Sequence, residues 1–406
     1  MESTSWIEID LGAIGRNVSV LRRALEPIGG GEPPSICAVL KADGYGLGAV
    51  RLAKRLAGAG VEMLAVYTPE QARELVDAAV GLPILVLMPI RSMGRDDRLY
   101  RAASRGLLHL TVHDAGCVDG VEQIADRLGL ELPVHLFVDT GMTRCGAPME
   151  ECRGLARRIM GHPRLRLAGV CSHLSSADCD DDLTRTQGEM FGAWVESMRL
   201  PADCAVHLSN SYGVFRSRGL HAGMVRTGLA LLGYGEEEFA DPSSFELAGI
   251  AMELEHSVRW CSRVVQVKDI APNTPVGYGA TWRALRPTRI ATIPVGYADG
   301  YPLALSNEGQ VGVRLDGDRV AYAPLVGRVS MDQITVDVTD LRDAVGIGTI
   351  VDVVGTDRDG PNALPALAAQ AGTITHELLC RLSARVPRKY APIELRPVVA
   401  ATSQIR

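Results

Sequence analysis

Short apolar runs alternate with amphipathic stretches along the first part of the chain. The stretches between the runs have helical periodicity, for example at 49–59, 69–80 and 149–160, and Thr68-Pro69-Glu70 is a typical helix start. Eight runs have the length and aliphatic content of buried strands: residues 36–40, 63–67, 84–88, 107–112, 134–138, 167–171, 205–208 and 224–225. This alternation predicts a (β/α)8 barrel. An open doubly wound sheet is the alternative, but no GxGxxG sequence follows the first strand.

The second part of the chain has a different pattern, in which β-branched runs alternate with turn sequences. The runs are residues 257–270, 289–295, 310–313, 321–329, 333–338 and 349–354, followed by helical stretches at 361–371 and 373–382. They predict a mainly antiparallel β domain. We therefore expect an α/β barrel domain over residues 1–245 and a β-rich domain over 246–406, with residues 1–10 as a candidate strand of the second domain.

A lysine, Lys41, stands directly after the apolar run 36–40 and before a glycine-rich turn. At the carboxyl end of a strand, this side chain would point into the crevice where α/β proteins bind ligands. An amine held in a partly apolar pocket can lose its proton and form a Schiff base. On the local sequence alone, a surface lysine beside an ordinary turn is the simpler interpretation.

Other polar side chains follow later strands of the predicted barrel. Arg144 follows run 134–138, His173 follows 167–171, Asn210 and Ser211 follow 205–208, and Arg226 follows 224–225. Each has a simple structural explanation, such as a helix cap or an ion pair. Four successive strand ends with such residues favour a shared site, because the carboxyl ends of barrel strands lie at one face.

Composition and charge narrow the function classes. The net charge is −6 and no basic patch indicates nucleic-acid binding. The nine cysteines are scattered without a CxxC pair, so neither a disulfide framework nor a zinc site is indicated. No apolar run has membrane-spanning length, and the first residues do not resemble a signal peptide. We expect a cytoplasmic protein that acts on a small molecule.

The run Val39-Leu40-Lys41-Ala42-Asp43-Gly44-Tyr45-Gly46 resembles the pyridoxal-phosphate lysine motif of the alanine racemase family, which are fold-type III pyridoxal-phosphate enzymes. The opening Trp6-Ile7-Glu8-Ile9-Asp10-Leu11 is also similar to that family. Three later segments match family motifs: 276–281, 295–300 and 327–332. The resemblance therefore extends over nearly the whole chain.

The resemblance implies racemisation of L-alanine to D-alanine, with pyridoxal phosphate bound to Lys41. It implies that His173 stacks on the cofactor ring and that Arg226 faces the pyridine nitrogen. Residues expected around the phosphate are Tyr45, Asn210, Ser211, Gly228 and Leu229, and Ser211 could also cap the following helix. Because arginine does not readily give up a proton, Arg226 would keep the pyridine nitrogen unprotonated, which disfavours side reactions.

A second base is implied on the other face of the substrate. By resemblance this base is Tyr278, and it comes from the partner subunit of a head-to-tail homodimer with a twofold axis. The partner's backbone at Met331 would hold the substrate carboxylate, with Arg144 nearby. Tyr297, Arg328 and Asp178 resemble the family's entrance residues.

Three positions depart from patterns common in the family. Phe137 stands where many members have a lysine that orients the active-site arginine, and Ser330 stands where cysteine is frequent. Ala384 replaces a tyrosine of the inner gate, and Tyr390 does not have the spacing to replace it. The small Ala384 leaves open a racemase of broader specificity, for example for serine. More distant alternatives are a fold-type III decarboxylase and a non-catalytic pyridoxal-phosphate-binding protein.

Overall fold

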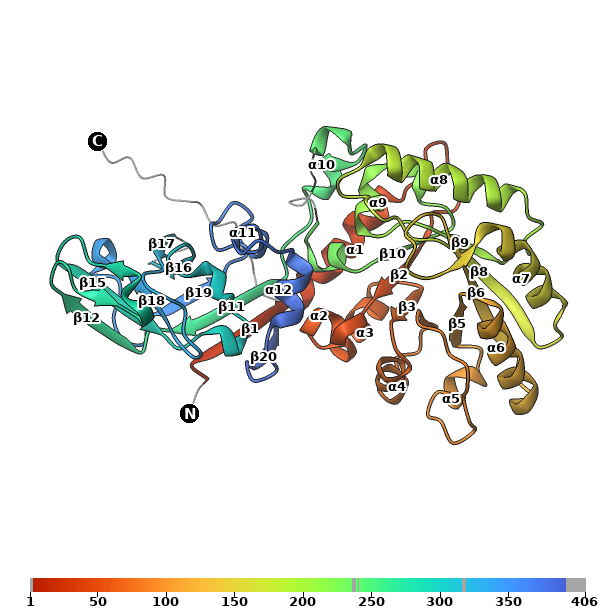
Figure 1. The fold of residues 1–406 in the computed structure, drawn as a ribbon, viewed down its shortest axis with the longest axis horizontal. Coiled ribbons are helices and arrows are strands. Elements are labelled where there is room, and N and C mark those ends of the chain that lie inside the picture. Colours follow the sequence, from red (N-terminus) through yellow and green to blue (C-terminus); the bar gives the residue numbers. More distant parts are fainter. Residues whose placement is uncertain (1–2, 236–238, 240, 316–318, 392–406) are drawn as a thin grey trace. The chain divides into compact units, whose positions relative to one another are not determined.

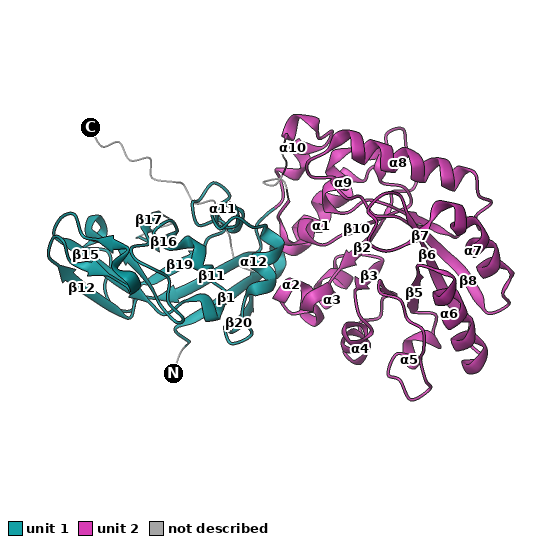
Figure 2. Cartoon of the chain, viewed as in Figure 1, with its two compact units in different colours: residues 1–13, 255–406 teal, residues 14–254 magenta. Residues whose placement is uncertain are grey.

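The computed structural model (Figure 1) describes residues 3–235, 239, 241–315 and 319–391 of the chain. The chain divides into two compact units (Figure 2): Ile14–Leu254 form one, and Met1–Ala13 together with Glu255–Arg406 form the other. We call them the barrel unit and the β unit. None of the helices in the described ranges is long and apolar enough to cross a membrane.

The barrel unit contains a closed sheet of eight parallel strands. They are β2 (Ser35–Val39), β3 (Met63–Val66), β4 (Ile84–Val86), β5 (Leu108–Val112), β6 (Leu132–Asp139), β8 (Leu165–Cys171), β9 (Ala205–His207) and β10 (Met224–Thr227). The strand order is β5-β4-β3-β2-β10-β9-β8-β6, and pairing of β5 with β6 closes the ring. The two-residue strand β7 (Ala147–Pro148) adds to β6 outside the ring. The (β/α)8 prediction is confirmed.

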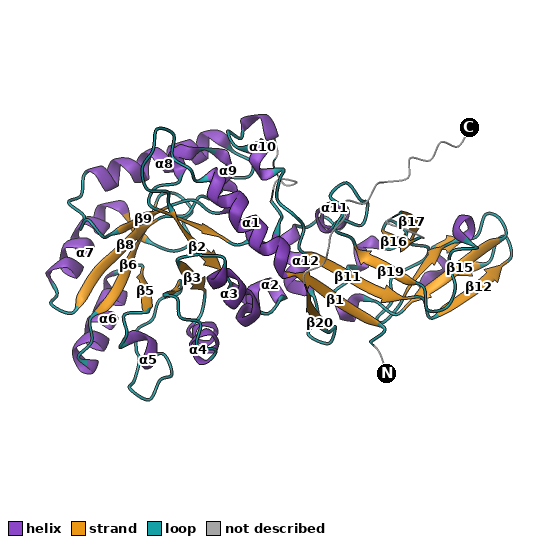
Figure 3. Ribbon diagram, turned by 180° about the vertical axis from the view of Figure 1, so that it is seen from behind, coloured by secondary structure: helices purple, strands orange, loops and turns teal. Residues whose placement is uncertain are grey.

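Helices surround these strands (Figure 3). They are α1 (Leu11–Ala24), α3 (Ala49–Gly58), α4 (Pro69–Asp77), α5 (Tyr100–Ala103), α6 (Ala115–Leu128), α7 (Met149–Gly161), α8 (Asp181–Glu196), α9 (Ser211–Arg216) and α10 (Ala248–Ala251). The predicted start at Thr68 is confirmed. Its side chain accepts a hydrogen bond from the backbone of Gln71, and the Gln71 side chain accepts one from the backbone of Thr68.

Alternate residues of the strands fill the barrel. On β2, β3, β4 and β10 they form an apolar cluster of Cys37, Val39, Met63, Ala65, Leu85 and Met224, with Leu87 and Ala205 packed against it. Buried histidines instead occupy β5, β6 and β9, at His109, His135 and His207. The barrel interior is therefore apolar beside β2, β3 and β4 and polar beside β5, β6 and β9.

The β unit is mainly antiparallel, as predicted. A six-stranded sheet has the order β17-β16-β19-β11-β1-β20, and a three-stranded sheet has the order β12-β15-β18. The strands are β1 (Ser5–Asp10), β11 (Val258–Arg263), β12 (Gln266–Ile270), β15 (Thr288–Ile293), β16 (Gln310–Arg314), β17 (Val320–Pro324), β18 (Ile334–Asp337), β19 (Ile350–Val354) and β20 (Arg388–Ala391). The short pair β13 (Pro275–Val276) and β14 (Trp282–Arg283) and the helices α11 (Leu364–Gln370) and α12 (Thr375–Arg381) complete the unit. Strand β1 pairs antiparallel with β11 and parallel with β20.

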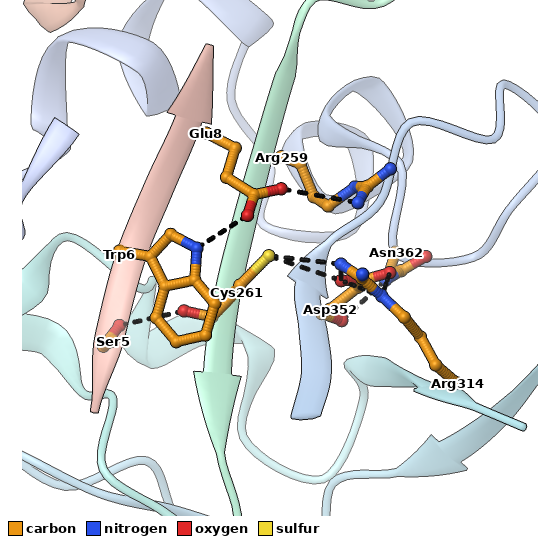
Figure 4. A network of polar contacts seen from close by, with 8 residues as sticks. All are labelled: Ser5, Trp6, Glu8, Arg259, Cys261, Arg314, Asp352 and Asn362. Carbon is orange, nitrogen blue, oxygen red and sulfur yellow. Dashed lines mark hydrogen bonds and ion pairs between the residues drawn. The ribbon is translucent and has the colours of Figure 1, made fainter. Parts of the chain in front are cut away.

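A polar network ties the central strands of the larger sheet together (Figure 4). Arg314 on β16 donates from Nε and Nη2 to the Asp352 carboxylate on β19, with its shortest bond at 2.6 Å. On β1, Glu8 accepts from Trp6 Nε1 at 2.8 Å and from Arg259 Nη1 at 3.4 Å. Asp352 is only 6% exposed, so the paired Arg314 is what makes its burial tolerable.

Candidate active site

The turn that begins with Lys41 has an unusual backbone. In α2 (Lys41–Gly46), the residues Ala42, Asp43, Gly44 and Tyr45 all have left-handed angles, with φ between 54° and 62°. This conformation costs roughly 1–2 kcal/mol for each residue that is not glycine, and such strain is typical of functional sites. The Asp43 carboxylate stabilises the turn because it accepts the backbone N–H of Ala49 at 2.7 Å, where α3 begins. Lys41 is exposed at the carboxyl end of β2.

Hydroxyl groups and backbone N–H groups form a small cradle beside this turn. The buried Tyr45 hydroxyl lies so close to Gly228 that a Cβ at residue 228 would be 2.0 Å from it. Ser211 Oγ accepts the N–H groups of Gly228 and Ala230, each at 3.2 Å. Asn210, not Ser211, caps α9, through its side-chain oxygen and the N–H of Gly213 at 2.9 Å. The hydroxyl groups of Ser211 and Tyr45 can both donate hydrogen bonds, which suits a phosphate group.

The predicted residue Gly228 lies at this cradle through its backbone N–H, and the predicted Leu229 directly follows it. Leu229 begins a short 3-10 turn, Leu229–Leu232, and its side chain is buried. The second N–H that reaches Ser211 belongs to Ala230, a residue that sequence reasoning did not include.

Arg226 is buried on β10, where its guanidinium donates several hydrogen bonds. Nη1 bonds to His207 Nδ1 at 2.8 Å and to the His207 carbonyl at 3.0 Å. Nη2 bonds to the Ser172 carbonyl at 2.7 Å and to His173 Nδ1 at 3.1 Å. Burial lowers the pKa of Arg226 below its usual range, but a guanidinium stays protonated in proteins. These contacts hold a permanently charged guanidinium in place on β10.

Three positively charged side chains influence His173. Burial, together with repulsion from Arg226, Arg144 and Lys41, lowers the pKa of His173 to about 3. The imidazole is therefore neutral at neutral pH. The 3.1 Å contact between Arg226 Nη2 and His173 Nδ1 joins the ends of β10 and β8, and the charges of Arg144 and Lys41 also act on His173.

Arg144 and Asp178 lie on loops at the same end of the barrel strands. Asp139 shapes the Arg144 loop by accepting the N–H groups of Gly141 at 2.9 Å and Thr143 at 3.1 Å. Phe137 packs beside His113, with ring centroids 5.3 Å apart, so an aromatic contact occupies the place of the expected lysine. Among the described residues, no ion pair orients Arg144. Asp178 is half-buried.

The β unit brings its own predicted site residues together on neighbouring loops. Tyr278 is 72% exposed, Met331 is 53% exposed, and Tyr297 and Arg328 are also exposed. The backbone N–H of Tyr297 donates to the Ser330 carbonyl at 3.1 Å. A Cβ on Gly277, beside Tyr278, would be 3.2 Å from the Arg328 nitrogen. The three motifs therefore form one surface.

An arginine that sequence reasoning did not select braces this surface. Arg385 donates from Nε to Asp299 and from Nη2 to Asp332, each at 2.7 Å. It thereby links the Tyr297 loop to the Met331 loop. Ala384, its neighbour, is exposed, and the adjacent Ser383 N–H donates to the Asp299 carbonyl at 2.9 Å. Tyr390 lies on β20, opposite Ile9 of β1.

The buried histidines of β5, β6 and β9 were also missed. The sequence signal was a histidine between aliphatic residues in three separate runs: Leu108-His109-Leu110, Val134-His135-Leu136 and Val206-His207-Leu208. In a strand, this pattern places the imidazole on the face opposite its aliphatic neighbours. Because every one of these strands belongs to a closed barrel, all three side chains converge in its interior.

Comparisons with known proteins agree with this architecture. Family models described as "Alanine racemase, N-terminal domain" and "Alanine racemase, C-terminal domain" match residues 9–236 and 257–390. The chain belongs to the alanine racemase family. An alanine racemase of Sorangium cellulosum is 37% identical over 404 residues, covering 94% of this chain and 98% of the relative. That of Halothermothrix orenii is 34% identical over 389 residues, covering 95% and 96%.

Solved structures of the family have the same fold. The alanine racemase of E. faecalis superposes with a TM-score of 0.81 at 31% identity, covering 96% of this chain and 98% of the other. The alanine racemase of Bartonella henselae, described with covalently bound pyridoxal phosphate, gives a TM-score of 0.79 at 28% identity, covering 96% and 100%.

Proposed function

We propose that the protein racemises alanine between its L and D forms with pyridoxal phosphate as cofactor. The observation that carries this proposal is the assembly at the strand ends of the barrel unit: the Lys41 turn, the donor cradle and the buried Arg226. The residues fit the cofactor, because the cradle beside Gly228 suits its phosphate and Arg226 suits an unprotonated pyridine nitrogen. When bound, the cofactor withdraws electron density from the substrate Cα and makes its proton acidic.

The residues of this chain then have distinct roles. Lys41 holds the cofactor and moves a proton on one face of Cα, and Tyr278 moves a proton on the opposite face. Tyr45, Asn210, Ser211, Gly228 and Leu229 hold the phosphate side, and His173 covers the ring. Arg144 and the Met331 backbone bind the carboxylate, while Tyr297, Arg328 and Asp178 limit access.

We further propose a head-to-tail homodimer in which each site is completed by the partner's β unit. The exposure of Tyr278, Met331 and Tyr297 on one surface supports this, because large side chains of this kind are usually covered in an assembled site. Buried thiols such as Cys37, Cys117 and Cys152 suit a reducing compartment, and we place the enzyme in the cytoplasm. There it would supply D-alanine as a peptidoglycan precursor.

A second candidate is a racemase of broader specificity. The exposed Ala384, next to the segment that contacts the Tyr297 loop, favours it, because a small side chain replaces a phenol there. A decarboxylase is less well supported, because it would be expected to place an acid rather than Arg226 against the pyridine nitrogen.

The test of the proposed function uses the purified holoenzyme. We expect a yellow protein in which borohydride reduction attaches the cofactor to the peptide that contains Lys41. Incubation with a panel of amino acids in deuterated water should show Cα exchange and D/L interconversion, fastest for alanine. A cofactor attached to another lysine, or exchange without interconversion, would contradict the assignment.

A further inference from the structure

A continuous hydrogen-bonded series of side chains crosses the barrel interior. Arg226 Nη1 lies 2.8 Å from His207 Nδ1, His207 Nε2 lies 2.9 Å from His135 Nδ1, and His135 Nε2 lies 2.8 Å from His109 Nδ1. We call His109, His135 and His207 the histidine chain. Its members come from β5, β6 and β9, and each is at most 7% exposed.

The arginine at one end determines where the protons lie. A guanidinium has only donors, so His207 Nδ1 must accept and cannot carry a hydrogen. A neutral His207 then has its proton on Nε2 and donates it to His135 Nδ1. The same reasoning gives His135 a proton on Nε2, which it donates to His109 Nδ1. One fixed cation thus imposes the same neutral tautomer on three imidazoles in series.

The barrel is built to admit this series. Gly169 on β8 faces His135, and a Cβ at residue 169 would lie 2.2 Å from His135 Nδ1 and 3.0 Å from the Ala205 carbonyl oxygen. Any side chain at residue 169 would displace the His135 imidazole and break its hydrogen bond to His207. The neighbouring strands instead fill their part of the interior with aliphatic side chains. The histidine chain therefore also requires a glycine at position 169.

We propose that the histidine chain is a single-tautomer support, with every proton on Nε2, that positions the Arg226 guanidinium for its contact with the cofactor. His109 is thereby a positioning residue two imidazoles away from the arginine. The part of the proposal that concerns the cofactor rests on the proposed function. The tautomer assignment does not, because it follows from Arg226 and the three imidazoles alone.

The decisive measurement is nitrogen-15 solid-state NMR of the holoenzyme labelled at histidine, with signals assigned by single histidine variants. At pH 7.5 we expect protonated Nε2 and unprotonated Nδ1 for His109, His135 and His207. A proton on Nδ1 of His135 or His207, or a doubly protonated ring in the chain, would overturn the inference. This readout is independent of catalysis, so it stands even if the enzyme proves to have another substrate.

The functional part compares two variants at one position. His109→Leu removes the acceptor for His135 Nε2, whereas His109→Asn supplies an oxygen near the position of Nδ1. We expect His109→Leu to lower kcat for alanine about tenfold with KM changed less than twofold, and to shift the cofactor absorption band, as follows from loss of one buried hydrogen bond. His109→Asn should restore most of kcat and the band.

A matched control uses a buried histidine outside the histidine chain. His221 bonds through Nε2 to the Val214 carbonyl at 2.7 Å. His221→Asn should leave the absorption band and kcat at wild-type values. Equal kcat and equal absorption for His109→Leu, His109→Asn and wild type would contradict the proposed positioning role of His109. If His109→Leu does not fold, the NMR result on the wild type still decides the tautomers.

Discussion

Protonation of His109 should destabilise the fold in mild acid. Burial lowers the pKa of His109 from 6.5 to about 4, and repulsion from Arg166 contributes. Because its pKa is lower in the folded state than in the unfolded chain, the unfolded state binds more protons below pH 6.5. Stability is therefore complete above that pH and falls as the pH drops towards 4. From these two values, linkage gives a loss of about 2.5 kcal/mol between pH 7.5 and pH 4.5.

The assay is urea unfolding of wild type and His109→Asn at several pH values and one fixed protein concentration. Other groups titrate in both proteins, so the informative quantity is the difference between their free energies of unfolding. The ionisable neighbours that bear on His109 are His135, its hydrogen-bond partner, and Arg166. We expect the variant to gain about 2.5 kcal/mol relative to wild type on going from pH 7.5 to pH 4.5. A difference that does not change with pH would refute the reasoning.

Three other predictions concern the proposed site. Tyr278→Phe should slow solvent-deuterium entry from one alanine enantiomer more than from the other, because each base serves one face; equal rates from both would count against this role. A mixture of Lys41→Ala chains and Tyr278→Phe chains, each inactive in racemisation alone, should regain some activity once the subunits exchange, because a hybrid dimer has one intact site. No recovery after proven exchange would place each site within one chain. The enzyme should racemise serine measurably, and Ala384→Tyr should shift kcat/KM towards alanine by up to about 1–3 kcal/mol in discrimination. An unchanged serine-to-alanine ratio would remove Ala384 from the specificity argument.

The strands were predictable because buried parallel strands are short, continuous apolar runs bounded by turns. The last one shows the limit of that signal. The apolar run ended at Val225, but β10 continues through Arg226 and Thr227. A buried arginine breaks the hydrophobic pattern, and only its carbonyl and imidazole partners on other strands make its burial possible.

Site residues whose chemistry depends on their type, such as Lys41, could be predicted from the sequence. Features that depend on the backbone conformation or on contacts between distant residues could not. Nothing in Ala42 or Asp43 indicates a left-handed backbone, which depends on how the next helix begins. The bond between His135 and His207 joins residues 72 positions apart, and its existence requires the closed barrel. We predicted that Ser211 could cap the following helix, but Asn210 has that role, and Ser211 Oγ instead accepts the N–H groups of Gly228 and Ala230 from a loop distant in sequence.

The pairing of β1 constrains the order in which the protein can be completed during synthesis. Ile7 lies opposite Trp260 on one side and Arg388 on the other, so the larger sheet combines both ends of the described chain. The barrel strands all emerge from the ribosome before Val258, and they can associate while the first strand still lacks both neighbours. An exposed strand edge of this kind favours aggregation. A fusion directly before β1 and a truncation after β19 would thus damage the same sheet, although the two changes lie far apart in the sequence.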